Sequence, residues 1–430
     1  MQAAEQEIDY LGMLNPAQRL AAEFGERTDG RGFESGPLLV IAGAGTGKTM
    51  TLAHRVAHLV IEGVDPERIL LLTFTRRAAE EMTRRVENIV RGSAPDSTVL
   101  PPGGLPWAGT FHSVANRLLR RFAHNLGLDP GFSVLDRGDA ADKLDVVRHE
   151  LKLTRTSRRF PKKDTCLAIY SRCVNAQQPL ADVLDQVFPW CADWAEELAA
   201  LFRGYVDRKQ QSQSLDYDDL LLYWMHLVAE PEFAEEIGSW FDHILVDEYQ
   251  DTNILQARVL NALKPDGSGL TVVGDDAQSI YSFRSAEVEN ILGFPDQFTP
   301  TARVVTLEQN YRSTQAILDA ANCLIAESER QYRKDLFSEG RDGARPHHVT
   351  VEDGDAEAEY VVSAILANRE LGMQLRDQAV LFRGSHHSDR LELELVRRNI
   401  PYVKYGGLKF LEAAHVKDLL SVLKWAENPR

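Results

Sequence analysis

Short apolar runs alternate with longer amphipathic stretches along most of the chain. Each run has the length of a β-strand, and each is followed by a stretch whose apolar positions recur with helical spacing. Such alternation is typical of an α/β fold, in which helices cover a parallel sheet. The runs are Leu38–Ile41, Ile69–Phe74, Ile244–Val246, Leu270–Val273, Val304–Leu307 and Ala379–Phe382.

One long segment, residues 113–214, contains no strand-like run and has helical, mixed-charge stretches instead. We interpret it as a helical insertion within the first α/β domain. That domain is then expected to consist of residues 1–112 and 215–300, and a second α/β domain is expected at residues 301–430.

The first apolar run leads directly into residues 42–49, which read Ala-Gly-Ala-Gly-Thr-Gly-Lys-Thr. A strand followed by such a loop is typical of a phosphate-binding site, in which glycines turn backbone N–H groups toward the phosphates. We expect Lys48 to reach the β- and γ-phosphates and the Thr49 hydroxyl to bind Mg²⁺. The strict pattern has glycine where Ala42 stands, and the alternative is a glycine-rich turn. The expected nucleotide-binding residues of the loop are Gly43, Gly45, Thr46, Gly47, Lys48 and Thr49.

Two later apolar runs end in polar side chains that suit nucleotide hydrolysis. Asp247 and Glu248 follow the run at residues 244–246, where the first could hold Mg²⁺ and the second could orient the attacking water. Gln278 follows the run at residues 270–273 and could sense the γ-phosphate. An ordinary surface turn is the alternative for Asp247 and Glu248.

Aromatic and cationic residues follow Gln278 closely. Tyr281, Phe283 and Arg284 suit stacking on unpaired nucleic-acid bases. Core packing is the alternative for this segment.

Taken together, these segments resemble superfamily 1 DNA helicases of the UvrD/Rep/PcrA type, and the likeness extends nearly from end to end. The matching segments, in the family's order, are residues 15–18, 42–49, 73–79, 109–113, 215–221, 247–251, 274–281, 309–314 and 400–407. The resemblance implies two RecA-like P-loop domains with parallel sheets, a helical insertion in the first and an incomplete second domain. It also implies an ATP-dependent helicase or translocase that moves along single-stranded DNA with 3′-to-5′ polarity, in DNA repair or replication restart.

The resemblance also implies roles for individual residues. Gln18 would hydrogen-bond the adenine edge, Tyr311 would stack on adenine, and Arg312 would reach the γ-phosphate. Arg284 would bridge toward Glu248. The residues implied to contact DNA are Phe74, Arg76, Phe111, His112, Tyr281, Phe283 and Arg284.

The chain departs from the family pattern at several points. Met50 stands where Arg is frequent, Arg76 and Arg77 replace a frequent Asn-Lys pair, and Ser285 stands where Gly is common. The sequence stops at Arg430, before the family's final motifs, so we expect an incomplete motor that is weakly active alone. Two rival hypotheses are a non-motor module that binds ATP and DNA, and the helicase subunit of a helicase–nuclease complex.

Composition adds limits to this picture. The net charge is −16, so contact with nucleic acid has to come from local basic stretches, of which residues 117–121 and 155–163 are the clearest. Solvated helix faces and loops are the alternative interpretation of both. No run of about 18 apolar residues is present, so we expect a cytoplasmic protein without a membrane partner. ATP and Mg²⁺ are the expected cofactors, and single-stranded and duplex-tailed DNA are the expected partners. The four cysteines are expected to be thiols rather than metal ligands.

Overall fold

Five of the six apolar runs form strands of one parallel sheet. The computed structural model describes residues 9–28, 32–93, 100–101, 103–153, 159–340, 342–405, 416, 418–419 and 422–423, with the side chain of Arg284 left aside. The sheet has the order β10-β3-β9-β8-β4-β5, and every neighbouring pair is parallel. The predicted α/β fold class is therefore confirmed. The strands are β3 (Leu38–Ala42), β4 (Ile69–Thr73), β5 (Trp107–Thr110), β8 (His243–Val246), β9 (Leu270–Gly274) and β10 (Arg303–Leu307).

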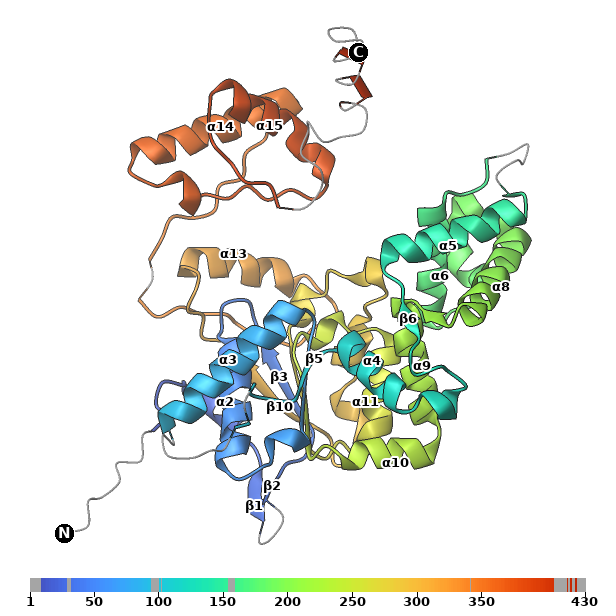
Figure 1. Cartoon of the computed structure of the whole chain (residues 1–430). Helices are drawn as coiled ribbons and strands as arrows, with labels where there is room; N and C mark the ends of the chain where they lie inside the picture. The colour runs from blue at the N-terminus through green and yellow to red at the C-terminus, as the bar shows by residue number, and fades with distance from the viewer. Residues whose placement is uncertain are drawn as a thin grey trace, which may run out of the picture. The chain divides into compact units, whose positions relative to one another are not determined.

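Helices cover both faces of this sheet, as Figure 1 shows. Alternate side chains of each strand point to opposite faces, so Leu38 and Val40 pack in one core and Leu39 and Ile41 in the other. Because both faces are covered, β3 is apolar throughout and β4 is apolar up to Thr73, rather than alternating. The first core is formed with α2 (Lys48–Ile61) and α3 (Arg76–Ser93), next to which lies α1 (Pro16–Glu23). The second is formed with α4 (Phe111–Arg121), α9 (Tyr217–Ala229), α10 (Pro231–Ser239), α11 (Ile254–Leu263) and α12 (Val288–Leu292).

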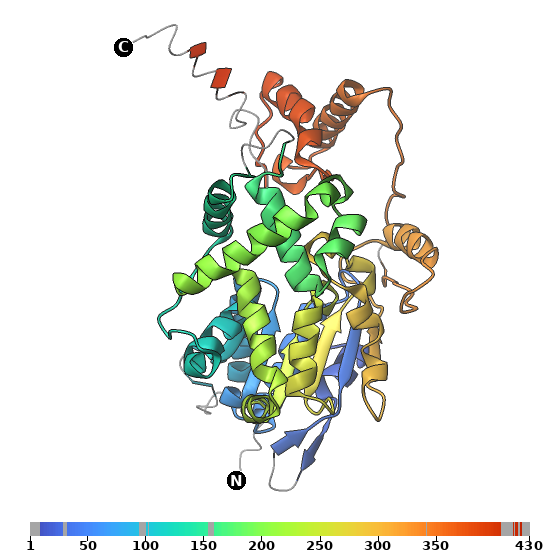
Figure 2. The same cartoon turned by 90° about the vertical axis from the view of Figure 1, so that its right-hand side faces the viewer.

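The helical insertion has a core of its own. Leu144, Ile169, Leu198 and Tyr205 are fully buried in it, and they come from three helices, the last two from the same one. Figures 1 and 2 show these helices gathered as a separate group. The helices are α5 (Arg137–Glu150), α6 (Lys163–Ala176), α7 (Leu180–Gln186) and α8 (Ala195–Gln211). Helix α4 packs with the sheet instead, so the independent bundle begins later than residue 113. Short strand pairs are β1 (Glu26–Thr28) with β2 (Gly32–Glu34), and β6 (Ser133–Val134) with β7 (Ser214–Leu215).

The chain divides into two compact units, residues 1–345 and 346–430. We expected the second domain to begin at residue 301, whereas β10 pairs with β3 at the edge of the first sheet. Helix α13 (Gln315–Ala326) also lies within the first unit. An apolar run alone does not reveal which sheet it joins, because that depends on a partner strand more than 250 residues away.

The second unit contains α14 (Gly354–Glu370) and α15 (Ser388–Arg397), which pack around Val362, Leu395 and Ile400. The expected strand at residues 379–382 has no strand pairing in the structure. Residues 406–415, which include part of one matching segment, lie outside the described residues.

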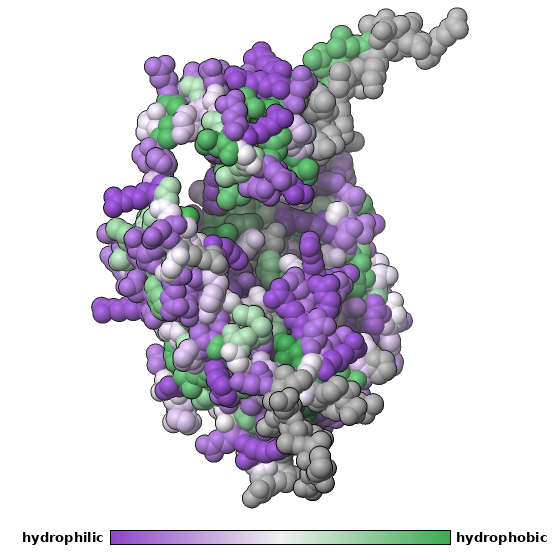
Figure 3. Space-filling view, turned by 90° about the vertical axis from the view of Figure 1, so that its left-hand side faces the viewer, coloured by the Kyte–Doolittle hydropathy of each residue, from purple (hydrophilic) through white to green (hydrophobic). Residues whose placement is uncertain are grey.

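Figure 3 shows the character of one face of the molecule. On the face drawn in Figure 3, hydrophilic residues predominate and apolar ones form small patches. Within the described residues, no helix combines the length and the apolar character that crossing a bilayer requires.

Candidate functional site: a nucleotide cleft beside an aromatic cluster

The loop between β3 and α2 has the backbone of a phosphate cradle. Gly45 and Gly47 have φ angles of +88° and +84°, which residues with a side chain rarely adopt. A Cβ atom on Gly47 would lie 2.6 Å from Nε2 of Gln18, so a side chain there would displace the Gln18 amide as well as strain the backbone. Thr46 stabilises the turn by donating from its hydroxyl to the carbonyl of Gly43 at 2.8 Å. The loop therefore has the form that the motif predicts, with α2 beginning at Lys48.

Two acidic residues lie opposite the first turn of α2. Lys48 forms an ion pair with Glu248, and the Lys48 side chain is largely buried. Asp247 lies at the end of β8, where burial and, secondarily, the charge of Glu248 raise its pKa to about 6. Its carboxylate accepts a hydrogen bond from the backbone N–H of Glu248 at 3.0 Å. Glu248 itself has a φ of +52°, a strained value for a residue with a side chain. Strain of this kind is frequent at functional sites.

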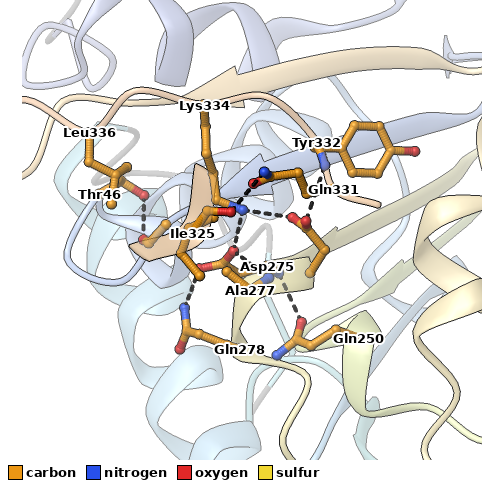
Figure 4. A network of polar contacts seen from close by, with 12 residues as sticks. Thr46, Gln250, Asp275, Ala277, Gln278, Ile325, Gln331, Tyr332, Lys334 and Leu336 are labelled. Carbon is orange, nitrogen blue, oxygen red and sulfur yellow. Dashed lines mark hydrogen bonds and ion pairs between the residues drawn. The ribbon is translucent and has the colours of Figure 1, made fainter. Parts of the chain in front are cut away.

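Hydrogen bonds continue from Glu248 to the end of β9. Gln250 donates from Nε2 to Glu248 at 2.8 Å and accepts from the backbone N–H of Asp275 at 3.0 Å. Gln278 donates from Nε2 to the Asp275 carboxylate at 2.6 Å. Figure 4 shows Gln250 and Gln278 on the same side of Asp275. The two post-strand segments that we selected from the sequence are thus connected.

The segment after β10 is hydrogen-bonded to the phosphate loop. Asn310, which is buried, donates from its side chain to the carbonyl of Ala44 at 2.6 Å. The backbone N–H of Tyr311 donates to the carbonyl of Gly45 at 2.9 Å. Arg312 is exposed, and its Cβ is 2.7 Å from where a Cβ on Gly45 would lie. The structure therefore brings the two implied nucleotide-binding residues, Tyr311 and Arg312, beside the loop.

Gln18 belongs to a capping box at the start of α1. Its Oε1 accepts from the backbone N–H of Asn15 at 3.0 Å, and its Nε2 donates to the carbonyl of Thr46 at 2.9 Å. The side chain is fully buried. Adenine recognition by Gln18 stays a prediction that requires this side chain to become accessible. Asn15 in turn donates to the hydroxyl of Tyr311 at 3.0 Å.

Three of the implied DNA-contacting aromatic residues form a cluster. The ring centroids of Phe74 and Tyr281 are 5.3 Å apart, and those of Tyr281 and Phe283 are 5.7 Å apart. Phe283 is 69% exposed, so core packing does not account for it. A cleft of about 520 Å³ is lined by Thr49, Asp247, Glu248, Gln278, Phe74 and Tyr281, among others. One cleft thus contains both nucleotide-site carboxylates and part of the aromatic cluster.

Phe111 and His112, which the resemblance also implies as DNA contacts, are not part of this aromatic cluster. Phe111 is only 5% exposed and packs in the core beside Trp224, so the structure assigns it to packing rather than to base stacking. His112 lies 5.7 Å from the ring of Tyr217, and burial lowers its pKa to about 4. It is therefore neutral at pH 7. Arg76 is exposed at the start of α3, and the Arg284 side chain, with its expected bridge to Glu248, lies outside the described residues.

The basic residues of α4 have structural partners. The guanidinium groups of Arg117, Arg120 and Arg121 lie 3.6, 4.4 and 4.2 Å from aromatic ring centroids. Cation–π contacts of this kind favour the structural interpretation of residues 117–121. In the other stretch, residues 154–158 lie outside the described part of the chain, and Lys163 pairs with Asp142.

The comparisons with known proteins agree with this geometry. The model of the UvrD/REP helicase N-terminal domain matches residues 26–299. The chain belongs to the UvrD/REP helicase family. The model of the UvrD-like helicase C-terminal domain matches residues 305–430. The UvrD/REP family assignment confirms the resemblance that the sequence motifs indicated.

Two curated relatives share much of this sequence. The ATP-dependent DNA helicase PcrA of Staphylococcus aureus is 36% identical over 396 residues, which cover 91% of this chain and 52% of that protein. The protein of the same name from Staphylococcus epidermidis is 37% identical over the same coverage. The chain therefore spans about half the length of the curated relatives it matches.

The residues present fit a magnesium nucleotide. The glycines at positions 45 and 47 carry no side chains that would obstruct the loop, and Lys48 provides a cation beside it. Thr49 and Asp247 line the same cleft and offer a hydroxyl and a carboxylate, which are oxygen ligands that Mg²⁺ prefers. Asn310 and Gln250 are parts of the site that we did not select from the sequence as functional residues. Asn310 contacts Ala44, 266 residues away, and Gln250 connects Glu248 with Asp275 at the end of the next strand.

Proposed function

We propose that this chain provides the ATP-binding and single-strand-binding part of an ATP-dependent DNA helicase that translocates with 3′-to-5′ polarity. The observation that carries the proposal is the single cleft that contains Asp247 and Glu248 at one side and Phe74 and Tyr281 at another. Nucleotide chemistry and base stacking would then take place on adjoining segments after β8, β9 and β4. The relatives named ATP-dependent DNA helicase support the same function.

The phosphate loop and α2 would bind the triphosphate. Lys48 would exchange its partner Glu248 for the β- and γ-phosphates, which leaves the Glu248 carboxylate available to orient a water molecule. Thr49 and Asp247 would hold Mg²⁺, which compensates phosphate charge. Tyr311 would pack against the base, while Gln278 and Arg312 would contact the γ-phosphate. The loss of the Lys48–Glu248 pair on ATP binding is thus part of the proposal.

The aromatic cluster would contact the DNA. Phe283 and Tyr281 offer faces on which unpaired bases can stack without regard to sequence. Arg76 at the start of α3 would add a phosphate contact. We propose single-stranded and duplex-tailed DNA as substrates, and repair or replication restart as the setting.

Turnover by these 430 residues alone is expected to be slow. Among the described residues that line the cleft, Arg85 is the single arginine, and it pairs with Glu81. Charge that develops on the transferred phosphoryl group would therefore be compensated mainly by Lys48 and Arg312. A further arginine beside Arg312 would typically contribute about 10³–10⁵ in rate, and apart from the paired Arg85 the described residues that line the cleft include none.

The test is ATP turnover measured under single-turnover conditions, with and without single-stranded DNA. We expect slow hydrolysis that DNA accelerates, and we expect Lys48→Ala to weaken ATP-analogue affinity by about 10- to 150-fold, the scale of a charged hydrogen bond. Binding of ATP and DNA without any DNA-stimulated turnover would favour the non-motor module instead. Unchanged analogue affinity in the Lys48→Ala protein would contradict the assignment of the loop.

A further inference from the structure

Lys334 is a buried cation in a segment that none of the sequence motifs includes. Its ammonium group lies 2.6 Å from a carboxylate oxygen of Asp275 and 2.6 Å from one of Asp276. All three side chains are at most 4% exposed. Lys334 follows α13, whereas the two aspartates follow β9, so the triad joins segments nearly 60 residues apart.

The triad continues into the nucleotide site through Asp275. One oxygen of Asp275 faces Lys334, and the other accepts the 2.6 Å hydrogen bond from Gln278. Figure 4 shows Lys334 reaching Asp275 from the side opposite Gln278 and Gln250. The backbone N–H of Asp275 donates to Gln250, and Gln250 donates to Glu248. Polar contacts therefore run without interruption from Lys334 to Glu248.

The charge of Lys334 is what makes this arrangement stable. Two carboxylates buried next to each other repel and are costly unless a cation compensates them. Asp276 has a second contact with the segment after α13, because its carboxylate accepts a hydrogen bond from the backbone N–H of Tyr332 at 3.1 Å. Within the described part of the chain, Lys334 is the one ion-pair partner that the segment after α13 gives to Asp275. The same carboxylate oxygen also accepts a longer hydrogen bond, 3.2 Å, from the backbone N–H of Ala277. Removal of the ammonium group would leave the carboxylate held by this weaker contact, so it would shift and hold the Gln278 amide less firmly.

We infer that Lys334 is a positioning residue for ATP hydrolysis, which fixes Gln278 through Asp275. The inference rests on the proposed function, because it assigns Lys334 a role in that same site. The ion pairs of Lys334 are with residues after β9 and not with the phosphate loop, so it would affect the rate of hydrolysis more than nucleotide affinity. It also makes the segment after α13 part of the hydrolytic site.

Lys209 offers a matched control. It is also a buried lysine that pairs with two aspartates, Asp216 and Asp219, at 2.7 and 2.6 Å. It lies in α8 of the helical insertion, and its hydrogen-bond partners are Tyr170 and these two aspartates. Lys209→Met and Lys334→Met therefore remove the same charge from the same kind of environment.

The experiment compares the two variants in single-turnover ATP hydrolysis with single-stranded DNA, in ATP-analogue affinity and in thermal melting. We expect both variants to melt at lower temperature. We expect Lys334→Met to slow hydrolysis by about 10- to 100-fold, the scale seen when a supporting residue is removed, with affinity changed less than about threefold. Lys209→Met should keep the wild-type rate within about twofold at a temperature where it is folded.

A double-mutant cycle tests the route through Gln278. If Lys334 acts through that amide, Lys334→Met should slow a Gln278→Ala protein much less than it slows the wild type. If Lys334→Met does not fold, Lys334→Met combined with Asp276→Asn removes one charge of each sign, and Asp276→Asn alone is its reference. The double variant should then show the same loss of rate relative to that reference.

Three results would overturn the inference, and the third is distinguishable from the first two. Equal slowing by Lys334→Met and Lys209→Met, or slowing that is fully additive with Gln278→Ala, would overturn the positioning role alone. A wild-type chain that binds no ATP analogue and hydrolyses no ATP would overturn the proposed function, and this inference with it.

Discussion

Phe283 is the residue for which the structure separates DNA binding from stability most clearly. Its ring is 69% exposed, and its aromatic neighbour Tyr281 lies 5.7 Å away between centroids. Stacking of one base on an aromatic ring contributes about 1–3 kcal/mol, so Phe283→Ala should weaken single-strand binding by about 5- to 150-fold. The free energy of unfolding should fall by at most about 1.5 kcal/mol, the scale of an aromatic pair.

Phe111 provides the opposite case within the same protein. It is 5% exposed and packs beside Trp224, so Phe111→Ala should destabilise the fold by about 3–5 kcal/mol. The DNA affinity of the folded fraction should change little. The two variants remove the same side chain and should give opposite patterns.

Fluorescence anisotropy with a labelled oligonucleotide measures the affinity, and denaturant unfolding measures the stability. Both are recorded on the same protein preparations. A Phe283→Ala protein with wild-type affinity and a large loss of stability would refute the assignment of Phe283 to a DNA-contacting surface. Weakened DNA binding by folded Phe111→Ala would refute its assignment to the core.

Two further predictions concern charge. Burial raises the pKa of Asp247 to about 6, so its carboxyl group is about nine-tenths protonated at pH 5. Because the protonated form is a poor Mg²⁺ ligand, the Mg²⁺-dependent affinity for an ATP analogue should fall by about tenfold between pH 7 and pH 5. Calorimetry over this range checks the fall, and Asp247→Asn, measured with the same nucleotide, should lose this part of the pH dependence. A further test replaces Arg159, Lys162 and Lys163 together with neutral residues. The slope of log binding constant for DNA against log salt concentration should become shallower by about one for each phosphate that these side chains neutralise in the wild type. Arg117→Gln is the control and should leave this slope unchanged, because the Arg117 guanidinium lies over an aromatic ring. An unaltered slope in the triple variant would show that residues 159–163 are solvated and do not contact DNA.

The sequence was sufficient for features that depend on neighbouring residues. The phosphate loop at residues 42–49 and the acidic pair after β8 could be predicted because strand, loop and helix follow one another directly. The joining of β10 to β3 could not, because an apolar run carries no mark of its partner strand. An expected strand at residues 379–382 is not paired in the structure.

Side-chain roles that depend on distant contacts were the least predictable. Phe111 was expected to contact DNA, yet its burial follows from Trp224, more than 100 residues later. Asn310 reaches the carbonyl of Ala44 across 266 residues, and Lys334 reaches Asp276 across 58. Asn310 lies in a matched segment but its local pattern does not reveal its partner, and nothing in the local pattern around Lys334 distinguishes it from an ordinary polar position. The motifs therefore indicated which segments to consider for the site, whereas the supporting contacts required the fold.

The two bonds from Asn310 and Tyr311 to the phosphate loop have a mechanical consequence. They join Ala44 and Gly45 to the segment that leads into α13. We expect a displacement of the loop to pass through these bonds to the start of that helix as a tilt. Cys323 lies on α13 and is an exposed thiol, so the chain carries a natural attachment point for a spin label that would report this tilt. The state of the phosphate loop thereby becomes readable from a helix outside the cleft.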